Sequence, residues 1–176
     1  VTPIQDAAGN VAAQTSVTWS TNITAPTASF TAIATPRNLG AGVVTIDFTE
    51  DVTGFDITDL TLTRDGQPVS LLGLSLVPVS GSQYTIDLDV NATTDPEGLY
   101  ELSMVASGSD IIDDAGNALP NDVSVSWVMD TTAPTADILD VTPDPRTTDA
   151  DIVNVLFDEP VDRTTVDIID FTLTLD

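Results

Sequence analysis

The chain of 176 residues contains no Cys, no His and no Lys, and each absence excludes a class of chemistry. Without Cys there are no disulfides, thiolate nucleophiles or zinc–thiolate sites. Without His there is no Ser-His-Asp triad and no imidazole metal ligand. Without Lys there is no Schiff base, no phosphate-binding P-loop and no Lys–Asn isopeptide cross-link. The composition excludes most catalytic chemistry, so we expect a protein that is not an enzyme.

Positive charge is scarce, with four arginines against 28 acidic residues and a net charge of −24. Four scattered arginines cannot neutralise a run of phosphates, so we expect no nucleic-acid partner. The apolar runs are shorter than the ~20 residues that span a bilayer, and we expect no membrane insertion in this segment. Only 5% of residues are aromatic, which argues against the sugar-binding cleft that a two-carboxylate glycosidase needs.

The residues that are abundant favour β-structure. The apolar fraction of 41% is too high for the disorder that such a charge suggests. Of the 28 acids, 24 are Asp, and 27 residues are Thr. Asp and Thr prefer turns, caps and strands to helix interiors. This composition predicts an all-β protein.

An internal repeat sets the expected organisation. Five segments recur at offsets of 107 to 111 residues. They are 6–10 and 113–117, 16–19 and 124–127, 25–28 and 133–136, 46–52 and 155–161, and 56–63 and 167–174. We therefore expect tandem repeats of about 108 residues. In that division, 1–24 is the C-terminal strand or strands of a preceding repeat, 25–132 is one complete repeat, and 133–176 is the N-terminal part of a following one, as in a window onto a longer array.

The complete repeat predicts seven short strands separated by turn residues. The expected strands are 27–34, 43–48, 60–63, 69–79 (bent or divided in two), 84–90, 99–105 and 123–128. Seven strands in about 100 residues predict an antiparallel Greek-key β-sandwich. Trp19 and Trp127 occupy equivalent places in apolar-alternating segments, so both are expected in or near a core. Asp87 and Asp89 are expected to face solvent.

The motifs, taken together, resemble a known family. They are Phe48-Thr49-Glu50-Asp51-Val52, Phe55-Asp56-Ile57-Thr58-Asp59-Leu60-Thr61-Leu62, Asp113-Asp114-Ala115-Gly116-Asn117 and Asp130-Thr131-Thr132-Ala133-Pro134-Thr135. This combination resembles the bacterial Ig-like repeats of giant surface adhesins and biofilm-associated proteins. The resemblance implies an extracellular stalk of stacked Ig-like sandwiches on a bacterial cell surface, in which neighbouring repeats contact one another and calcium often stiffens the junctions. Two departures are an Asn22 where the next linker has Asp130, and Pro160 with two extra residues in the third repeat.

Acidic residues from distant segments predict a Ca²⁺ site where the chain joins the complete repeat. In an Ig-type sandwich, the loops expected at that end carry hard oxygen ligands, and Ca²⁺ takes six to eight such oxygens. Carboxylates brought together without a cation would repel one another, which a bound ion prevents. The candidate ligands are Glu50, Asp51, Asp56, Asp59, Asp113, Asp114 and Asn117, with Asn22 from the linker.

A second Ca²⁺ site is predicted at the following junction. Its candidate ligands are Asp95 and Glu97 in one loop, Asp130 in the linker, and Asp158 and Glu159 in the next repeat. Simpler interpretations stay open for both sites. The segment 113–117 could be only a turn, with Asp and Asn capping backbone amides and Gly116 at positive φ. Glu50 could be a solvated loop carboxylate, and the acids could serve solubility in a salty environment.

Three functions follow from these observations. The first is a tandem Ig-like spacer that ambient calcium stiffens into a rod, since the short linker and Pro134 already limit bending. The second is a module that binds a carbohydrate or another cell-surface or matrix ligand, for which Tyr84, Tyr100 and Phe55 are the spare aromatics. The third is a subunit of a self-assembling extracellular filament or surface lattice, in which copies of the chain pack laterally once divalent cations screen their charge.

Overall fold

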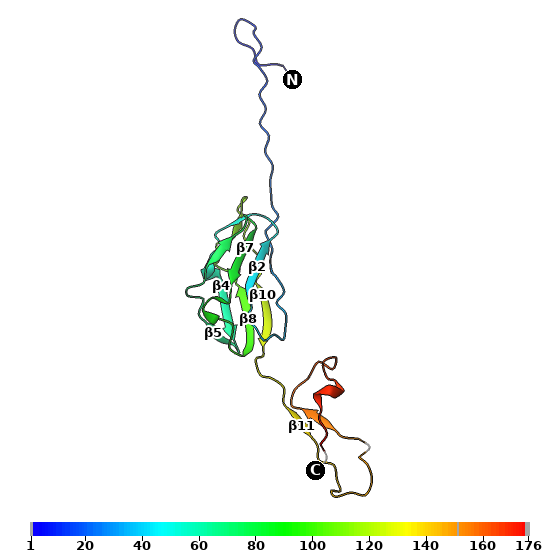
Figure 1. Cartoon of the computed structure of the whole chain (residues 1–176). Helices are drawn as coiled ribbons and strands as arrows, with labels where there is room; N and C mark the ends of the chain where they lie inside the picture. The colour runs from blue at the N-terminus through cyan, green and yellow to red at the C-terminus, as the bar shows by residue number, and fades with distance from the viewer. Residues whose placement is uncertain (1, 151, 175–176) are drawn as a thin grey trace. The chain divides into compact units, whose positions relative to one another are not determined.

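The computed structural model describes residues 2–150 and 152–174. The chain divides into two compact units, Val1–Asp130 and Thr131–Asp176 (Figure 1). Both units are built from antiparallel strands and single-turn 3₁₀ helices, with no α-helix among the described residues. The all-β prediction is confirmed.

Two four-stranded sheets form the body of the first unit (Figure 1). The first sheet has the order β1 (Ala28–Phe30), β2 (Val43–Phe48), β7 (Gln83–Asp87) and β6 (Leu76–Pro78). The second has the order β10 (Val123–Met129), β8 (Gly98–Met104), β4 (Leu60–Arg64) and β5 (Gln67–Val69). The remaining elements of the unit are the paired β3 (Val52–Thr53) and β9 (Ile112–Asp113), and the 3₁₀ turns η1 (Ile57–Asp59) and η2 (Val90–Ala92). Every strand pair is antiparallel.

Alternating side chains of both sheets fill one hydrophobic core. In β2 every second residue is buried, and β8 alternates in the same way. Because successive side chains of a strand point to opposite faces, this period directs one apolar face of each sheet inward. The shared core includes Val44, Ile46, Leu62, Ile86, Tyr100, Leu102, Met104 and Trp127. The two sheets thus pack in a sandwich-like arrangement.

The expected strand 27–34 is shorter than predicted because the chain changes sheets after β1. Thr31 still donates its N–H to the carbonyl of Thr45. A few residues later, Arg37 forms a parallel bridge with Met129 at the edge of the second sheet. The expected strand 69–79 is divided into β5 and β6. The expected strand 84–90 ends at Asp87, and Val90 lies in η2 instead of continuing the buried face.

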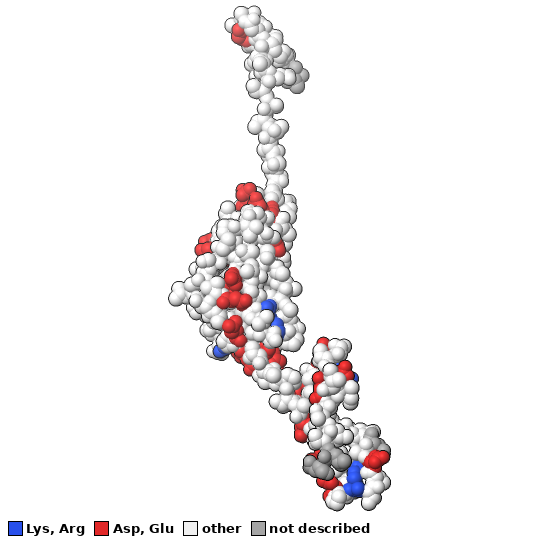
Figure 2. Space-filling model, viewed as in Figure 1, with Lys and Arg blue, Asp and Glu red and all other residues white. Residues whose placement is uncertain are grey.

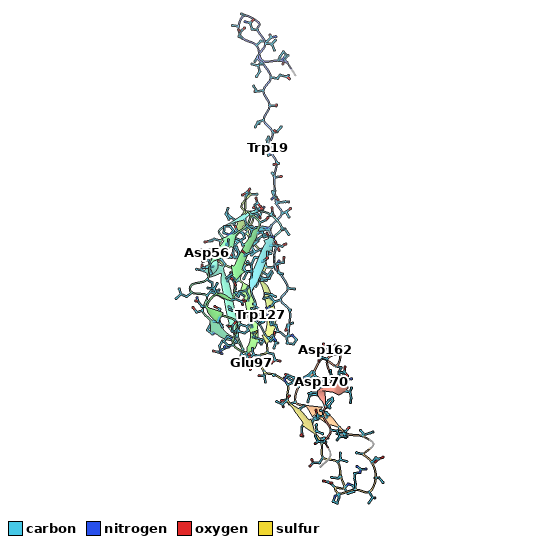
Figure 3. The ribbon with its side chains drawn as sticks, in the orientation of Figure 1. Trp19, Asp56, Glu97, Trp127, Asp162 and Asp170 are labelled. Atoms are coloured by element: carbon cyan, nitrogen blue, oxygen red, sulfur yellow. The ribbon has the colours of Figure 1, made fainter. Side chains whose placement is uncertain are left out.

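The two tryptophans differ, contrary to the prediction that both lie in or near a core. Trp127 is 1% exposed and stacks on Tyr100 with a centroid distance of 5.3 Å. Trp19 is 80% exposed (Figure 3). Trp127 is buried because β10 pairs along its whole length with β8, whereas residues 12–27 form no strand. Equivalent sequence therefore has unequal burial, because no strand in the described part of the chain pairs with the segment around Trp19.

The second unit holds one antiparallel pair, β11 (Ala136–Ile138) with β12 (Val155–Phe157), and the 3₁₀ turn η3 (Ile168–Asp170). Its apolar side chains remain largely accessible, and Ile168, Ile169 and Leu173 are all exposed. This unit has no second sheet among its described residues.

Candidate functional site

The segment 113–117 forms a tight turn around the carboxylate of Asp113. One oxygen, Oδ1, accepts the backbone N–H groups of Ala115 at 2.9 Å and Asn117 at 2.7 Å. The other, Oδ2, accepts the side-chain amide of Asn117 at 2.8 Å. Gly116 supplies φ = 87°, as this turn requires. The interpretation of this motif as a turn is confirmed.

The same hydrogen bonds hold Asp113 ionised. Although the residue is only 3% exposed, the Asn117 side chain and the backbone N–H groups lower its pKa below the ordinary value. Hydrogen bonds to the charged form favour that form over the neutral acid. The turn therefore presents a fixed anionic oxygen to its surroundings.

The linker residues 22–24 converge on this turn. The side-chain nitrogen Nδ2 of Asn22 donates to Glu50 Oε2 at 3.0 Å and to Asp113 Oδ2 at 3.1 Å. Asn117 Nδ2 donates to the backbone carbonyls of Asn22 and Thr24, each at 3.2 Å. We call the set Asn22, Thr24, Glu50, Asp113 and Asn117 the upstream junction. Figure 2 shows acidic side chains gathered where the N-terminal segment meets the sheets.

The upstream junction is rich in oxygen atoms. The two carboxylates and the two linker carbonyls already surround the amide nitrogens of the asparagines. A half-turn of the Asn117 amide would replace its nitrogen with an oxygen, since the two ends of the group have the same shape. That change would bring the number of oxygens to about five, and Ca²⁺ takes six to eight including waters. The donor set fits Ca²⁺, although among residues 2–150 and 152–174 no three carboxylates are grouped so as to hold a metal.

The structure brings four of the eight predicted ligands together, and two of the others bond locally instead. Asp56 and Asp59 form a capping box around η1, in which Asp56 Oδ1 accepts the Thr58 N–H at 2.7 Å and Asp59 Oδ2 accepts the Asp56 N–H at 2.8 Å. Asp51 lies against the β6–β7 turn, where a Cβ on Gly81 would meet its Cγ at 2.4 Å. Asp114 is exposed.

The capping box gives its two carboxyls different pKa values. The side chain and backbone N–H of Thr58 lower the pKa of Asp56. Burial raises the pKa of Asp59, and the nearby charges of Asp56 and Asp110 raise it further. The spacing Asp-x-x-Asp ahead of an apolar strand is the sequence signal for such a box. It indicates a local structural role for both residues.

The residues of the second predicted site lie in two different units. In the first unit, Asp95 lies beside Gly40, where an added Cβ would be 2.9 Å from Asp95 Oδ1. Glu97 is exposed (Figure 3). Asp130 is half-buried. In the second unit, Glu159 is half-buried.

Asp158, the remaining residue of that set, is bonded within its own unit. It accepts the backbone N–H of Thr135 at 2.8 Å and the Thr135 hydroxyl at 2.7 Å. These two hydrogen bonds lower its pKa. Asp158, which follows β12, therefore forms hydrogen bonds with Thr135, which precedes β11, and so joins the two strands of this pair at one end.

A feature missed in the sequence is an arginine that closes its own loop. The Arg37 guanidinium donates to the carbonyls of Leu39, Gly40 and Ala41. Arg146 repeats the arrangement, with Nε to the Thr148 carbonyl at 2.7 Å and a terminal nitrogen to the Asp149 carbonyl at 2.8 Å. The recurring Pro-Arg pair, at 36–37 and 145–146, is the signal that could have predicted it.

No known protein family matches the chain, and no curated protein matches it. Within the described part of the chain, none of the helices is long and apolar enough to cross a membrane. Arguments for function therefore come from the fold and from the upstream junction.

Proposed function

We propose that the chain is an extracellular structural spacer made of tandem Ig-like domains, stiffened by calcium at the domain junctions, within a large adhesin or surface protein of a bacterial cell. The observation that carries this proposal is the recurrence of the same local structures in both units. A repeated sequence that folds in the same way twice is typical of domain arrays.

The recurrence extends to strand register. In the first unit Ala28 pairs with Phe48 across β1 and β2, and in the second Ala136 pairs with Phe157 across β11 and β12. The capping box of η1 is repeated at η3 by Asp167 and Asp170. Together with the loop-closing arginines, these matches support a second copy of the same domain.

The strand order supports an Ig-like arrangement. With the strands of these two sheets lettered along the chain, the edge strand β5 and the short pair β3–β9 being left without letters, the first sheet has the order A-B-E-D and the second G-F-C, with β5 added beside C. Ig domains of the constant type combine an A-B-E-D sheet with a C-F-G sheet. The order in the first unit therefore agrees with the Ig pattern in both sheets.

The aromatic side chains favour a structural function over carbohydrate binding. Phe55 and Tyr100 are buried, at 8% and 0% exposure. Tyr84 is half-buried and packs edge-on against Phe48 and Phe55, with centroid distances of 5.9 and 4.9 Å. A sugar-binding surface would need such rings to be exposed for stacking. All three candidate aromatics contribute to the core instead.

The ion would be held at the upstream junction by five groups: the carboxylates of Glu50 and Asp113, the amide oxygen of Asn117, and the carbonyls of Asn22 and Thr24. When bound, Ca²⁺ would supply positive charge that neutralises the two carboxylates and ties the linker to the first unit. Extracellular modules bind it with a Kd of ~10⁻⁴–10⁻³ M. At ten times Kd, one ion adds ~1.4 kcal/mol to stability, which would be useful in a domain without disulfides.

Isothermal calorimetry of residues 1–176 after exhaustive chelation tests this proposal, with melting followed in parallel. We expect saturable binding with a Kd of ~10⁻⁴–10⁻³ M and a higher Tm. Both effects should be absent in the double variant Glu50→Gln/Asp113→Asn. They should persist in Asp87→Asn/Glu101→Gln, which removes equal charge from exposed strand positions. Absence of binding up to ~10 mM, well above that range, would refute the calcium part and leave a plain spacer.

A further inference from the structure

Asn22 holds the linker to the first unit through a neutral side chain. Its amide nitrogen has two hydrogens, and they point to the carboxylates of Glu50 and Asp113 at 3.0 and 3.1 Å. Its amide oxygen accepts the backbone N–H of Thr24 at 2.9 Å. One uncharged group thus satisfies two carboxylates and orders its own turn of the linker.

Asn117 completes the attachment from the other side. Its amide nitrogen reaches the carbonyls of Asn22 and Thr24, so the linker receives hydrogen bonds as well as donating them. Asn22 Nδ2 directs both of its hydrogens to carboxylates, whereas Asn117 Nδ2 divides its two hydrogens among the carbonyls of Asn22 and Thr24 and Asp113 Oδ2. Hydrogen bonds to charged groups are the stronger kind, and both bonds from Asn22 end on carboxylates.

We infer that Asn22 is a cation-independent latch, and that the residue at this position sets how far the junction depends on Ca²⁺. The second half of this inference rests on the proposed calcium site. An Asp at position 22 would place a third carboxylate beside Glu50 and Asp113, and mutual repulsion would release the linker unless a cation joined them. The charge of the ligands also sets Ca²⁺ affinity.

Sequence indicates that the protein uses both versions of this position. Residue 130 follows residue 22 at the repeat offset of 108, and it is Asp. Asn22, in the segment that precedes the sheets of the first unit, is thus the neutral form, whereas Asp130, the last residue of that unit, is the charged one. The inference predicts a first junction that stays ordered without calcium.

Backbone ¹⁵N order parameters of residues 21–25 in the full chain test the latch, measured in EDTA and then in 10 mM Ca²⁺. The wild type should be rigid in EDTA, with order parameters of about 0.85, and Asn22→Ala should fall below about 0.6. Asn22→Asp should be equally mobile in EDTA, become rigid in Ca²⁺, and bind the ion about tenfold more tightly than the wild type. Asn121→Asp adds the same charge at an exposed loop residue and should behave as the wild type.

The outcomes separate the latch from the proposed function. A wild-type linker that is mobile in EDTA, or an Asn22→Ala variant as rigid as the wild type, would overturn the latch. An Asn22→Asp variant that stays rigid in EDTA would also overturn it. If the wild type is rigid in EDTA and Asn22→Asp stays mobile in Ca²⁺, the latch stands, and its calcium dependence falls with the calcium proposal.

Discussion

Replacing Trp127 with Ala should unfold the first unit far more easily, and the cost can be worked out from its surroundings. A buried Trp removes about 150–250 Å² from water, which at ~25 cal/mol per Å² corresponds to about 4–6 kcal/mol. Stacking on Tyr100 adds about 0.5–1.5 kcal/mol. The indole N–H is buried without a hydrogen-bond partner, which offsets about 1–3 kcal/mol of this. We expect a net loss of about 3–5 kcal/mol, in the range of large-to-small core substitutions.

Urea unfolding followed by far-ultraviolet circular dichroism measures this loss, and the chain contains its own control. Trp19 occupies the equivalent repeat position but is 80% exposed, so Trp19→Ala should change stability by less than about 0.5 kcal/mol. Trp127→Phe keeps a stacked ring and removes the unbonded N–H, and it should cost less than about 1.5 kcal/mol. Equal losses for the two alanine variants would refute the assignment of the core.

Three further predictions concern acid sensitivity, a close backbone contact and the arginine loop. The Asn117 side chain holds the pKa of Asp113 below its ordinary value, so the ionised carboxylate contributes stability that is fully present above the unfolded-state pKa of ~4 and is lost as pH falls from there through the lower folded-state pKa. The urea midpoint should therefore decrease as pH is lowered below ~4, and less steeply in Asp113→Asn. Gly54→Ala should lower the free energy of unfolding by about 3 kcal/mol or more, because φ is +87° and the new Cβ would lie 2.2 Å from the backbone carbonyl oxygen of Asp110. Gly108→Ala is the control: its φ is +82° but the space around it is open. It should lower the free energy of unfolding by only about 1 kcal/mol in the same assay. Arg37→Lys should speed hydrogen exchange in residues 38–41 at least about tenfold, since an ammonium cannot reproduce the guanidinium fork, and unchanged exchange would contradict that role.

Much of the fold could be predicted because its strands alternate clearly. The segments 43–48 and 123–128 have period-two apolar patterns, and β2 and β10 occupy them with at most one residue added. The pairs β3–β9 and the turn η1 could not be predicted in this way, since elements of two or three residues have no measurable period. Trp19 was placed wrongly because sequence equivalence does not supply the neighbouring strand that buries a side chain.

The candidate site could be predicted only in part, for a physical reason. Residue type indicated the oxygen donors, and Asn22, Glu50, Asp113 and Asn117 do meet. The predicted set is larger than the group that the structure brings together, because a carboxylate can also bond its own backbone, as Asp56 does. The linker carbonyls could not be predicted, because every residue has one and only the path of the chain selects which of them converge.

The turn around Asp113 is encoded locally, and this has a consequence for the junction. Residues 6–10 form the same turn, with Asp6 Oδ1 accepting the Ala8 and Asn10 N–H groups at 2.9 Å each and Asn10 Nδ2 bonding Asp6 Oδ2 at 2.8 Å. That turn lies outside the sheets, so five residues suffice to orient the carboxylate.

The hydrogen bonds of the turn alone therefore orient the Asp113 carboxylate, and residue 22 determines which group contacts its Oδ2. An amide at position 22 donates a hydrogen bond to the Asp113 carboxylate. A carboxylate at that position would repel it unless a cation lay between the two. Under the proposed function, a change between Asn and Asp at residue 22 would alter the calcium dependence of the upstream junction and leave the two sheets unchanged. Successive junctions of the proposed array would then differ in stiffness at one calcium concentration.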